Sequence, residues 1–178
     1  MRKFEKISFE QFKKDVVDKK DVYINYNIPK RSTKYSAGYD FESPLDYIIK
    51  PGEIKKIPTG IKVTMNQDEM LMIVVRSSMG FKYNVRLCNQ VGIIECDYYN
   101  NESNEGHMWV ALQNHGEKDY IINKGDKFAQ GIFTKFLMVD DEEEIKNERK
   151  GGFGSTTKEG LNEKKEILYF NCYSLCIW

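Results

Sequence analysis

The positions of apolar residues favour strands over most of the chain. From residue 22 onward, short runs of β-branched and aromatic residues alternate with turn signals such as Pro51-Gly52 and Asn100-Asn101. The runs cover residues 22–26, 39–43, 47–50, 61–65, 71–75, 91–94, 108–113, 119–122 and 128–136. Their lengths and spacing are typical of a sandwich or barrel rather than of alternating β/α units. The pattern therefore predicts an all-β fold.

The first residues follow a helical pattern instead. Phe9 and Phe12 lie three positions apart, Ser8 is a favourable N-cap, and Gln11 completes a capping box. We expect a short helix over residues 8–20 that docks on the β domain.

The chain changes character again after residue 139. A charged run is followed by the glycine-rich GGFGST, a composition typical of a mobile arm. Residues 161–178 end in an uncharged apolar tail of high β-propensity, which must pair with a sheet or pack on a neighbour, or else is an aggregation hazard. The predicted division is an N-terminal helical segment (1–21), a β domain (22–139), a mobile arm (140–160) and a tail of unknown role (161–178).

Composition narrows the choice of partners. The 178 residues carry 27 Lys+Arg and 27 Asp+Glu, a formal net charge of +0, which disfavours direct binding to long nucleic acid. There is no run of about 18 apolar residues, so we expect a soluble cytoplasmic protein that does not bind a membrane. Four Cys without a CxxC and two His disfavour a zinc site or a Ser/His triad, and reduced thiols are the default expectation.

Two polar segments can supply phosphate and metal chemistry. SAGYD (36–40) places Asp40 at the start of a strand, although the same pattern also fits an ordinary strand start. RSSMG (76–80) presents Arg76, Ser77 and Ser78, a fork of donors with two hydroxyls that suits phosphate; a plain polar turn is the alternative.

Two further segments can supply a base and a binding surface. The apolar strand VGII runs into Glu95, where a general base could sit, and Tyr98 offers a flat face for a sugar or a base. The alternative is a hairpin whose acidic residues face solvent. Gln130 lies among apolar residues and needs a partner, either structural or a ligand.

The arm itself contains a fifth segment, ERKGGFGSTT (148–157). Its glycines and hydroxyls expose donors to an anion, Arg149 adds charge and Phe153 could stack on a base, although linkers look similar. A nucleotide polyphosphate is the ligand that accounts for all five segments most economically.

The segments resemble, in order, the five motifs of the homotrimeric dUTP diphosphatase (dUTPase) family: AGYD, RSS followed by Gly, GII-acid-x-DY, GDKFAQ and R-x-GGFGST. The resemblance spans residues 36–157. It implies a distorted β-jelly-roll and a homotrimer with active sites shared between subunits. It also implies Mg²⁺-assisted hydrolysis of dUTP to dUMP and pyrophosphate, a reaction that limits uracil in DNA and supplies dUMP for thymidylate synthesis.

The family's roles carry over residue by residue. Uracil would be bound by the hairpin through Asn89, Gly92 and Ile94, with Tyr98 under the deoxyribose to reject a 2′-hydroxyl. The phosphates would be held by Arg76, Ser77, Ser78 and Gln130, and Mg²⁺ by Asp40 through water. On the arm, Arg149, Gly154, Ser155 and Thr156 would close on the γ-phosphate while Phe153 stacks over uracil. Glu95 would deprotonate or position the water that attacks the α-phosphorus in line.

The chain departs from the family pattern in several places. Glu95 stands where Asp is usual, Lys127 stands where Arg is usual, and the segment NNESNEG (100–106) lengthens the hairpin. These changes keep open a dUTP-binding regulatory protein with weak turnover and a protein partner. A dCTP deaminase of the same fold is disfavoured because Ala111 occupies the position expected for its catalytic Glu.

Overall fold

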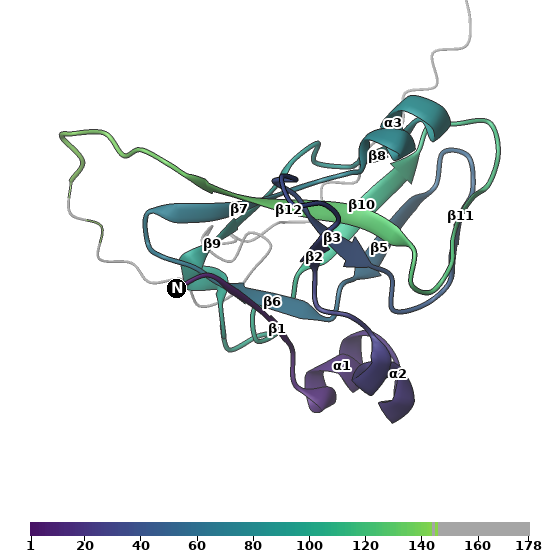
Figure 1. The fold of residues 1–178 in the computed structure, drawn as a ribbon, viewed down its shortest axis with the longest axis horizontal. Coiled ribbons are helices and arrows are strands. Elements are labelled where there is room, and N and C mark those ends of the chain that lie inside the picture. Colours follow the sequence, from purple (N-terminus) through teal and green to yellow (C-terminus); the bar gives the residue numbers. More distant parts are fainter. Residues whose placement is uncertain (144, 146–178) are drawn as a thin grey trace, which may run out of the picture.

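Short strands are the main regular structure in the described part of the chain, residues 1–143 and 145 of a computed structural model (Figure 1). The strands are β1 (Lys3–Lys6), β2 (Lys30–Arg31), β3 (Tyr39–Glu42), β4 (Tyr47–Ile49), β5 (Ile54–Pro58), β6 (Ile61–Thr64), β7 (Glu69–Val74), β8 (Val85–Leu87), β9 (Gly92–Glu95), β10 (Trp109–Asn114), β11 (Tyr120–Ile122) and β12 (Lys127–Lys135). The helices are α1 (Phe9–Asp15), α2 (Lys20–Asn25), α3 (Ser77–Tyr83) and the 3-10 helix η1 (Cys96–Tyr98).

The strands form antiparallel sheets whose neighbours are mostly far apart in sequence. The largest sheet has the order β2-β3-β12-β7-β9, and a second has the order β5-β10-β8. The remaining pairs are β1-β6 and β11-β4. The predicted all-β fold is confirmed.

The core lies between the sheets and follows from strict alternation along the central strands. In β7 every second residue is buried, among them Leu71 and Ile73, and β10 buries Val110 and Leu112 in the same way. Because successive side chains of a strand point to opposite faces, one face of each strand packs in the core and the other is left for ligands or partners.

The predicted N-terminal helix is shorter than expected. Ser8 caps α1 as predicted, and its side chain accepts a hydrogen bond from the Gln11 backbone N–H. The helix ends at Asp15 rather than at residue 20, because the β-branched pair Val16-Val17 that follows disfavours helix continuation.

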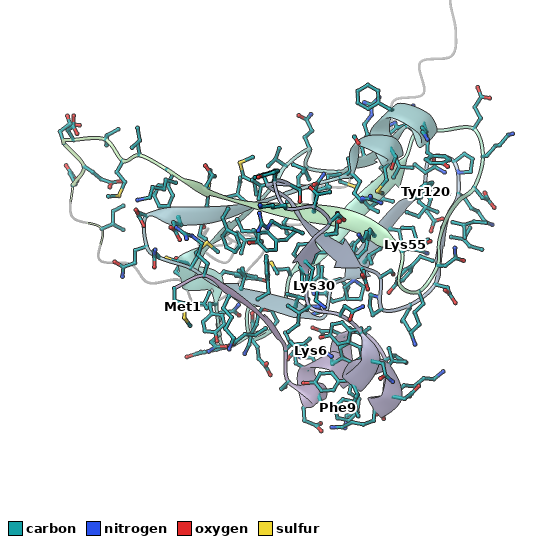
Figure 2. All side chains as sticks on the ribbon, viewed as in Figure 1. Met1, Lys6, Phe9, Lys30, Lys55 and Tyr120 are labelled. Atoms are coloured by element: carbon teal, nitrogen blue, oxygen red, sulfur yellow. The ribbon has the colours of Figure 1, made fainter. Side chains whose placement is uncertain are left out.

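The strand predicted over residues 22–26 is wrong, since residues 22–25 belong to α2 and Tyr26 is its C-cap. Val22 and Tyr26 are both buried, and a spacing of four residues brings them to one helical face. Tyr26 stacks on Phe12 of α1 with ring centroids 5.2 Å apart, and Lys6 lies 4.2 Å from the Tyr26 ring centroid. Figure 2 shows Lys6 and Phe9 at this end of the molecule.

The apolar pattern also missed β1, β2, β5, β8 and α3. The four strands are very short or rich in Lys, and α3 has only Met79 buried, so none of them carries a clear periodic signal. The missed strand β1 pairs with β6 over four residues and fixes the N-terminal segment against the β domain. The chain therefore enters the fold as a strand before the first helix.

Within residues 1–143 and 145, no helix is long and apolar enough to cross a bilayer. The predicted arm (140–160) and tail (161–178) lie almost wholly outside the described residues.

Candidate functional site

One group of polar side chains gathers where β3, β12 and β7 run side by side. Asp40 on β3 lies opposite Gln130 on β12, and Gln130 lies opposite Val74 at the end of β7. Arg76 follows two residues later, at the N-cap of α3. Sheet register thus brings three segments of the chain to one place, which we call the Asp40 cluster: Ser32, Asp40, Arg76, Lys127 and Gln130.

The Asp40 carboxylate is the centre of this cluster. It is 8% exposed, and its Oδ1 lies 3.5 Å from Arg76 Nε. Its Oδ2 accepts a hydrogen bond from Ser32 Oγ at 2.5 Å and lies 3.2 Å from Lys127 Nζ. Two cations face one carboxylate, so the cluster has an excess of one positive charge, which suits a polyphosphate.

Gln130 owes its place in the cluster to a glycine. A Cβ on Gly38 would lie 2.1 Å from Gln130 Oε1, so the amide end of Gln130 packs directly over the Gly38 backbone. The small residue of SAGYD therefore makes room for the candidate phosphate ligand on the next strand.

Ser77 and Ser78 form the first turn of α3 rather than the polar turn that the sequence left open. The first backbone N–H groups of a helix have no acceptor within the helix, and they point outward from its N-terminal end. Arg76, the two hydroxyls and these amides together form a donor-rich end next to Asp40.

A second group of predicted residues lines a separate pocket of about 230 Å³. We call it the hairpin pocket; its walls are Ile73, Leu87, Asn89, Gly92, Ile93, Ile94, Glu95, Tyr98, Met108 and Trp109. The chain passes here from β8 of the three-stranded sheet to β9 of the five-stranded sheet. The tight turn between them includes Gln90 in the left-handed region, with φ 61°.

The pocket combines a strand edge, an acid and a buried aromatic ring. β9 is the edge strand of its sheet, and an edge presents a row of backbone donors and acceptors that a planar base can pair with. Glu95 at the end of β9 is exposed, whereas Tyr98 is 7% exposed. The Tyr98 hydroxyl donates to the His107 carbonyl at 3.1 Å and accepts from Asn104 Nδ2 at 2.8 Å.

The Cys96 thiol beside Glu95 is not poised for nucleophilic chemistry. Burial raises its pKa, and the carboxylate of Asp97 raises that pKa further. A thiol needs a lowered pKa to act as a nucleophile or metal ligand. Among the described cysteines both Cys88 and Cys96 are free, in line with the expectation of reduced thiols.

The two groups lie far apart within one chain. Glu95 pairs with Met70 of β7. Asp40 is in register, through Gln130, with Val74, which lies four residues further along β7. In the sheet order, Asp40 on β3 lies two strands to one side of β7, and Glu95 on β9 lies one strand to the other side. At roughly 3.4 Å per residue and 4.8 Å per strand, these offsets separate their Cα atoms by about 20 Å.

The structure thus collects the predicted residues into two half-sites. Asp40, Arg76, Ser77, Ser78 and Gln130 fall in or beside the Asp40 cluster, and Asn89, Gly92, Ile94, Glu95 and Tyr98 line the hairpin pocket. The five predicted arm residues lie outside the described part of the chain: Arg149, Phe153, Gly154, Ser155 and Thr156.

Sequence reasoning missed several members of both groups. Ser32 lies in a polar stretch with no motif to mark it as part of a site. Lys127 stands where the family usually has Arg, but nothing in the sequence indicates that it contacts Ser32 and Asp40. Trp109, at the start of β10, lines the hairpin pocket because it alternates with the buried Met108 and Val110. That alternation was a usable signal.

Comparison with known proteins identifies the relatives of this chain. A family model described as dUTPase matches residues 25–157. A deoxyuridine 5′-triphosphate nucleotidohydrolase of Lactococcus lactis is 50% identical over 131 residues, 73% of this chain and 87% of that protein.

Solved structures agree on the fold. The dUTPase from Streptococcus mutans matches with a TM-score of 0.63 and 34% identity, covering 77% of this chain and 98% of that one. A mutant dUTPase from phage phi11 of S. aureus, described as coordinating a structural Mg(II) ion, matches with a TM-score of 0.59 over 83% of this chain and 99% of that one. At 18% identity that second match shows the fold alone. The fold expected from the resemblance, a dUTPase-like jelly-roll, is confirmed.

Proposed function

The chain belongs to the dUTPase family, and we propose that it hydrolyses dUTP to dUMP and pyrophosphate. The observation that carries this proposal is the pairing of two half-sites in one fold. One is a positively charged cluster around Asp40, and the other is a pocket that ends in the carboxylate of Glu95.

The hairpin pocket is the proposed site of the nucleoside. The edge of β9 from Gly92 to Ile94 would pair with uracil through backbone groups, with Asn89 at the same turn. The buried Tyr98 ring would lie under the deoxyribose, where a 2′-hydroxyl would find no room. A rigid aromatic surface of this kind discriminates by shape as well as by contact.

The Asp40 cluster is the proposed site of the phosphates. Arg76 supplies a fork of N–H donors, while Ser77, Ser78 and Gln130 supply neutral ones. Arg76 already faces Asp40, so binding of a polyphosphate would share this guanidinium between the carboxylate and the substrate.

The residues present fit a magnesium ion held mainly by the substrate. No group of three or more His, Cys, Asp or Glu side chains suited to a metal occurs in residues 1–143 and 145. Mg²⁺ keeps several waters and is usually held by one or two carboxylates together with substrate phosphates. Asp40 is the carboxylate that would hold its waters, and the bound ion would neutralise phosphate charge.

The proposed chemical step is attack of water on the α-phosphorus in line with the departing pyrophosphate. Glu95 would take a proton from that water or orient it, and its exposed position at the end of β9 leaves it accessible to solvent. A positioned base of this kind contributes about 10²- to 10⁴-fold to rate.

We also propose that the site is completed between subunits of a homotrimer. A general base must lie within hydrogen-bond reach of the water it activates. The separation of about 20 Å between Glu95 and Asp40 prevents one chain from placing both around a single α-phosphorus. Joining the Asp40 cluster of one chain to the hairpin pocket of another removes this conflict, and closed cyclic symmetry repeats the arrangement.

The arm would complete the site. By resemblance to the family, Arg149, Gly154, Ser155 and Thr156 would close on the γ-phosphate and Phe153 would stack over uracil. These assignments rest on the sequence motif alone.

Pyrophosphate release tests the proposal. Purified protein with Mg²⁺ is assayed with dUTP, dCTP, dTTP and UTP at enzyme concentrations that detect slow turnover. Release from dUTP in clear excess over the others supports the hydrolase. No release, with dUTP still raising the melting temperature, would contradict it in favour of a dUTP-binding regulatory protein.

A further inference from the structure

The N-terminal segment holds the loop that follows Tyr98 at three points. Tyr99 Oη donates to Glu5 Oε2 at 2.5 Å, and Ser8 donates from both N and Oγ to Glu105, at 2.9 and 2.5 Å. The third contact joins Asp15 Oδ2 to His107 Nδ1 at 2.7 Å. We call Glu5, Ser8 and Asp15 the brace. It lies outside residues 25–157, the part of the chain that the family model covers.

The contact between Asp15 and His107 fixes a buried ring in one orientation. His107 is fully buried, and its Nε2 accepts a hydrogen bond from the Gly60 backbone N–H at 2.8 Å. Nε2 must therefore carry a lone pair, so the proton is on Nδ1 and is donated to Asp15. The ring is held from both sides, by α1 and by the turn before β6.

The backbone of His107 in turn holds Tyr98. Its carbonyl accepts from the Tyr98 hydroxyl and from Asn104 Nδ2, which also donates to the Tyr98 hydroxyl. Asn104 and Glu105 belong to the segment 100–106 that lengthens the hairpin relative to the family. Within this segment the Asn104 side chain thus faces Tyr98 and that of Glu105 faces Ser8 of the brace.

We propose that Asp15, acting through His107, is a positioning residue that keeps Tyr98 in place as the floor of the nucleoside site. This inference rests on the proposed function, in which the Tyr98 ring rejects a ribose 2′-hydroxyl. A floor that discriminates one hydroxyl must be held within about 0.5 Å. The brace then acts on selectivity between deoxyribose and ribose substrates.

The test compares kcat/KM for dUTP and UTP in full-length protein. Asp15→Ala removes the acceptor from His107 and is expected to lower the dUTP/UTP ratio about tenfold, since displacements near 1 Å cost up to a hundredfold. Asp15→Asn keeps an oxygen acceptor at this position and is expected to restore most of the ratio. Asp21→Asn, at an exposed acid on α2, is the matched control and leaves the ratio unchanged.

A double-mutant cycle separates positioning from general loss of stability. Tyr98→Phe keeps the ring and removes only the hydroxyl that the loop holds. If Asp15 acts through Tyr98, adding Asp15→Ala to Tyr98→Phe lowers the ratio by much less than it does in the wild-type background. Independent, additive effects would overturn the inference even if Asp15→Ala lowers the melting temperature.

The arms of the experiment distinguish the two proposals. Wild-type protein that does not hydrolyse dUTP or does not prefer it to UTP removes the proposed function and this inference together. Wild-type protein that prefers dUTP, with Asp15→Ala unchanged in its ratio or indistinguishable from Asp21→Asn, removes the inference alone.

Discussion

The Asp40 cluster and the hairpin pocket are built in different ways. In the Asp40 cluster, strand register sets the positions: Asp40, Gln130 and Val74 share one row across three strands. In the hairpin pocket the buried Tyr98 lies on a 3-10 turn, and its hydroxyl is hydrogen-bonded to the loop that follows it. That loop is fixed by residues more than 90 positions earlier in the chain.

The difference has a mechanistic consequence. Phosphates are large, charged and tolerant of small displacements, so a cluster of donors on a sheet suffices to bind them. Selection of deoxyribose over ribose depends on a single hydroxyl and requires a contact surface that is itself held rigidly by neighbouring residues. Under the proposed function, the brace behind Tyr98 would provide that support.

Replacing the acid of the hairpin pocket is expected to have the largest effect. Glu95→Gln keeps the size of the side chain and removes its basicity, so kcat falls about 10²- to 10⁴-fold. Because Glu95 is exposed, the melting temperature stays close to that of the wild type. Pyrophosphate release and thermal unfolding measure the two quantities.

The companion variant Glu95→Asp addresses the departure from the family. If the longer side chain limits the rate, Asp raises kcat; a lower kcat would show that the hairpin backbone has adapted to Glu. Unchanged kcat in Glu95→Gln would exclude Glu95 as the base.

Mixing two inactive variants tests whether the half-sites meet between chains. Arg76→Ala removes the phosphate fork from the half-exposed Arg76 and is expected to abolish most turnover with little loss of stability. In randomly mixed trimers with Glu95→Gln, about one quarter of the sites combine an intact Asp40 cluster with an intact hairpin pocket. If both halves came from one chain, no mixed trimer would hold an intact site.

The assay unfolds and refolds, or co-expresses, the two variants together and compares pyrophosphate release with that of each variant alone. Recovery to about a quarter of wild-type turnover supports a shared site. Mixtures no more active than their components would leave the separation between Glu95 and Asp40 unexplained by trimer formation.

Two glycines, Gly38 directly before β3 and Gly131 in β12, allow substrate binding and core packing to be tested separately, with a smaller expected effect. A Cβ at Gly38 would meet the amide end of the flexible Gln130 side chain. A Cβ at Gly131 would instead meet Leu71 and Phe41 in the core, at 2.9 and 3.1 Å. Gly38→Ala is therefore expected to raise KM about tenfold, the value of one hydrogen bond to a charged group, with little change in stability. Gly131→Ala is expected to lower stability by about 1–3 kcal/mol.

Steady-state kinetics and urea unfolding on both variants check this contrast. A Gly38→Ala protein that loses stability and keeps its KM would show that Gln130 has only a structural role.

The parts of this molecule that could be predicted from sequence have local signals. The apolar runs 71–75 and 108–113 predicted the core strands β7 and β10. Asp40 and Arg76 stood out at the ends of such runs, and Gln130 as a polar residue among apolar neighbours. Each of these signals lies within about six residues of the feature it predicts.

The parts that could not be predicted depend on contacts distant in sequence. The run Val22–Tyr26 has strand-like composition, yet its first four residues lie in α2 and Tyr26, the C-cap, stacks on Phe12 of α1. Nothing near Asp15 indicates that its partner is His107, 92 positions away. The sequence shows that both residues are present, but it does not show that folding brings Asp15 and His107 together.

The smallest effect we predict is in the pH dependence of stability, and it arises at the brace. Burial lowers the pKa of His107, opposed in part by the nearby carboxylates of Asp15 and Glu105. A proton on Nε2 would also break the hydrogen bond from the Gly60 N–H. In the unfolded chain the same imidazole titrates at about 6.5.

Below that pH the unfolded state binds a proton that the folded state excludes, so stability falls as the pH decreases from about 6.5, and above it the group contributes no pH dependence. Between pH 7.5 and 5.5 the wild type is expected to lose more stability than His107→Gln. His115→Gln, which removes the exposed second histidine, is the control for the loss of an imidazole. Equal losses in the two variants would mean that His107 accepts its proton in the folded state and that its orientation between Asp15 and Gly60 is not fixed.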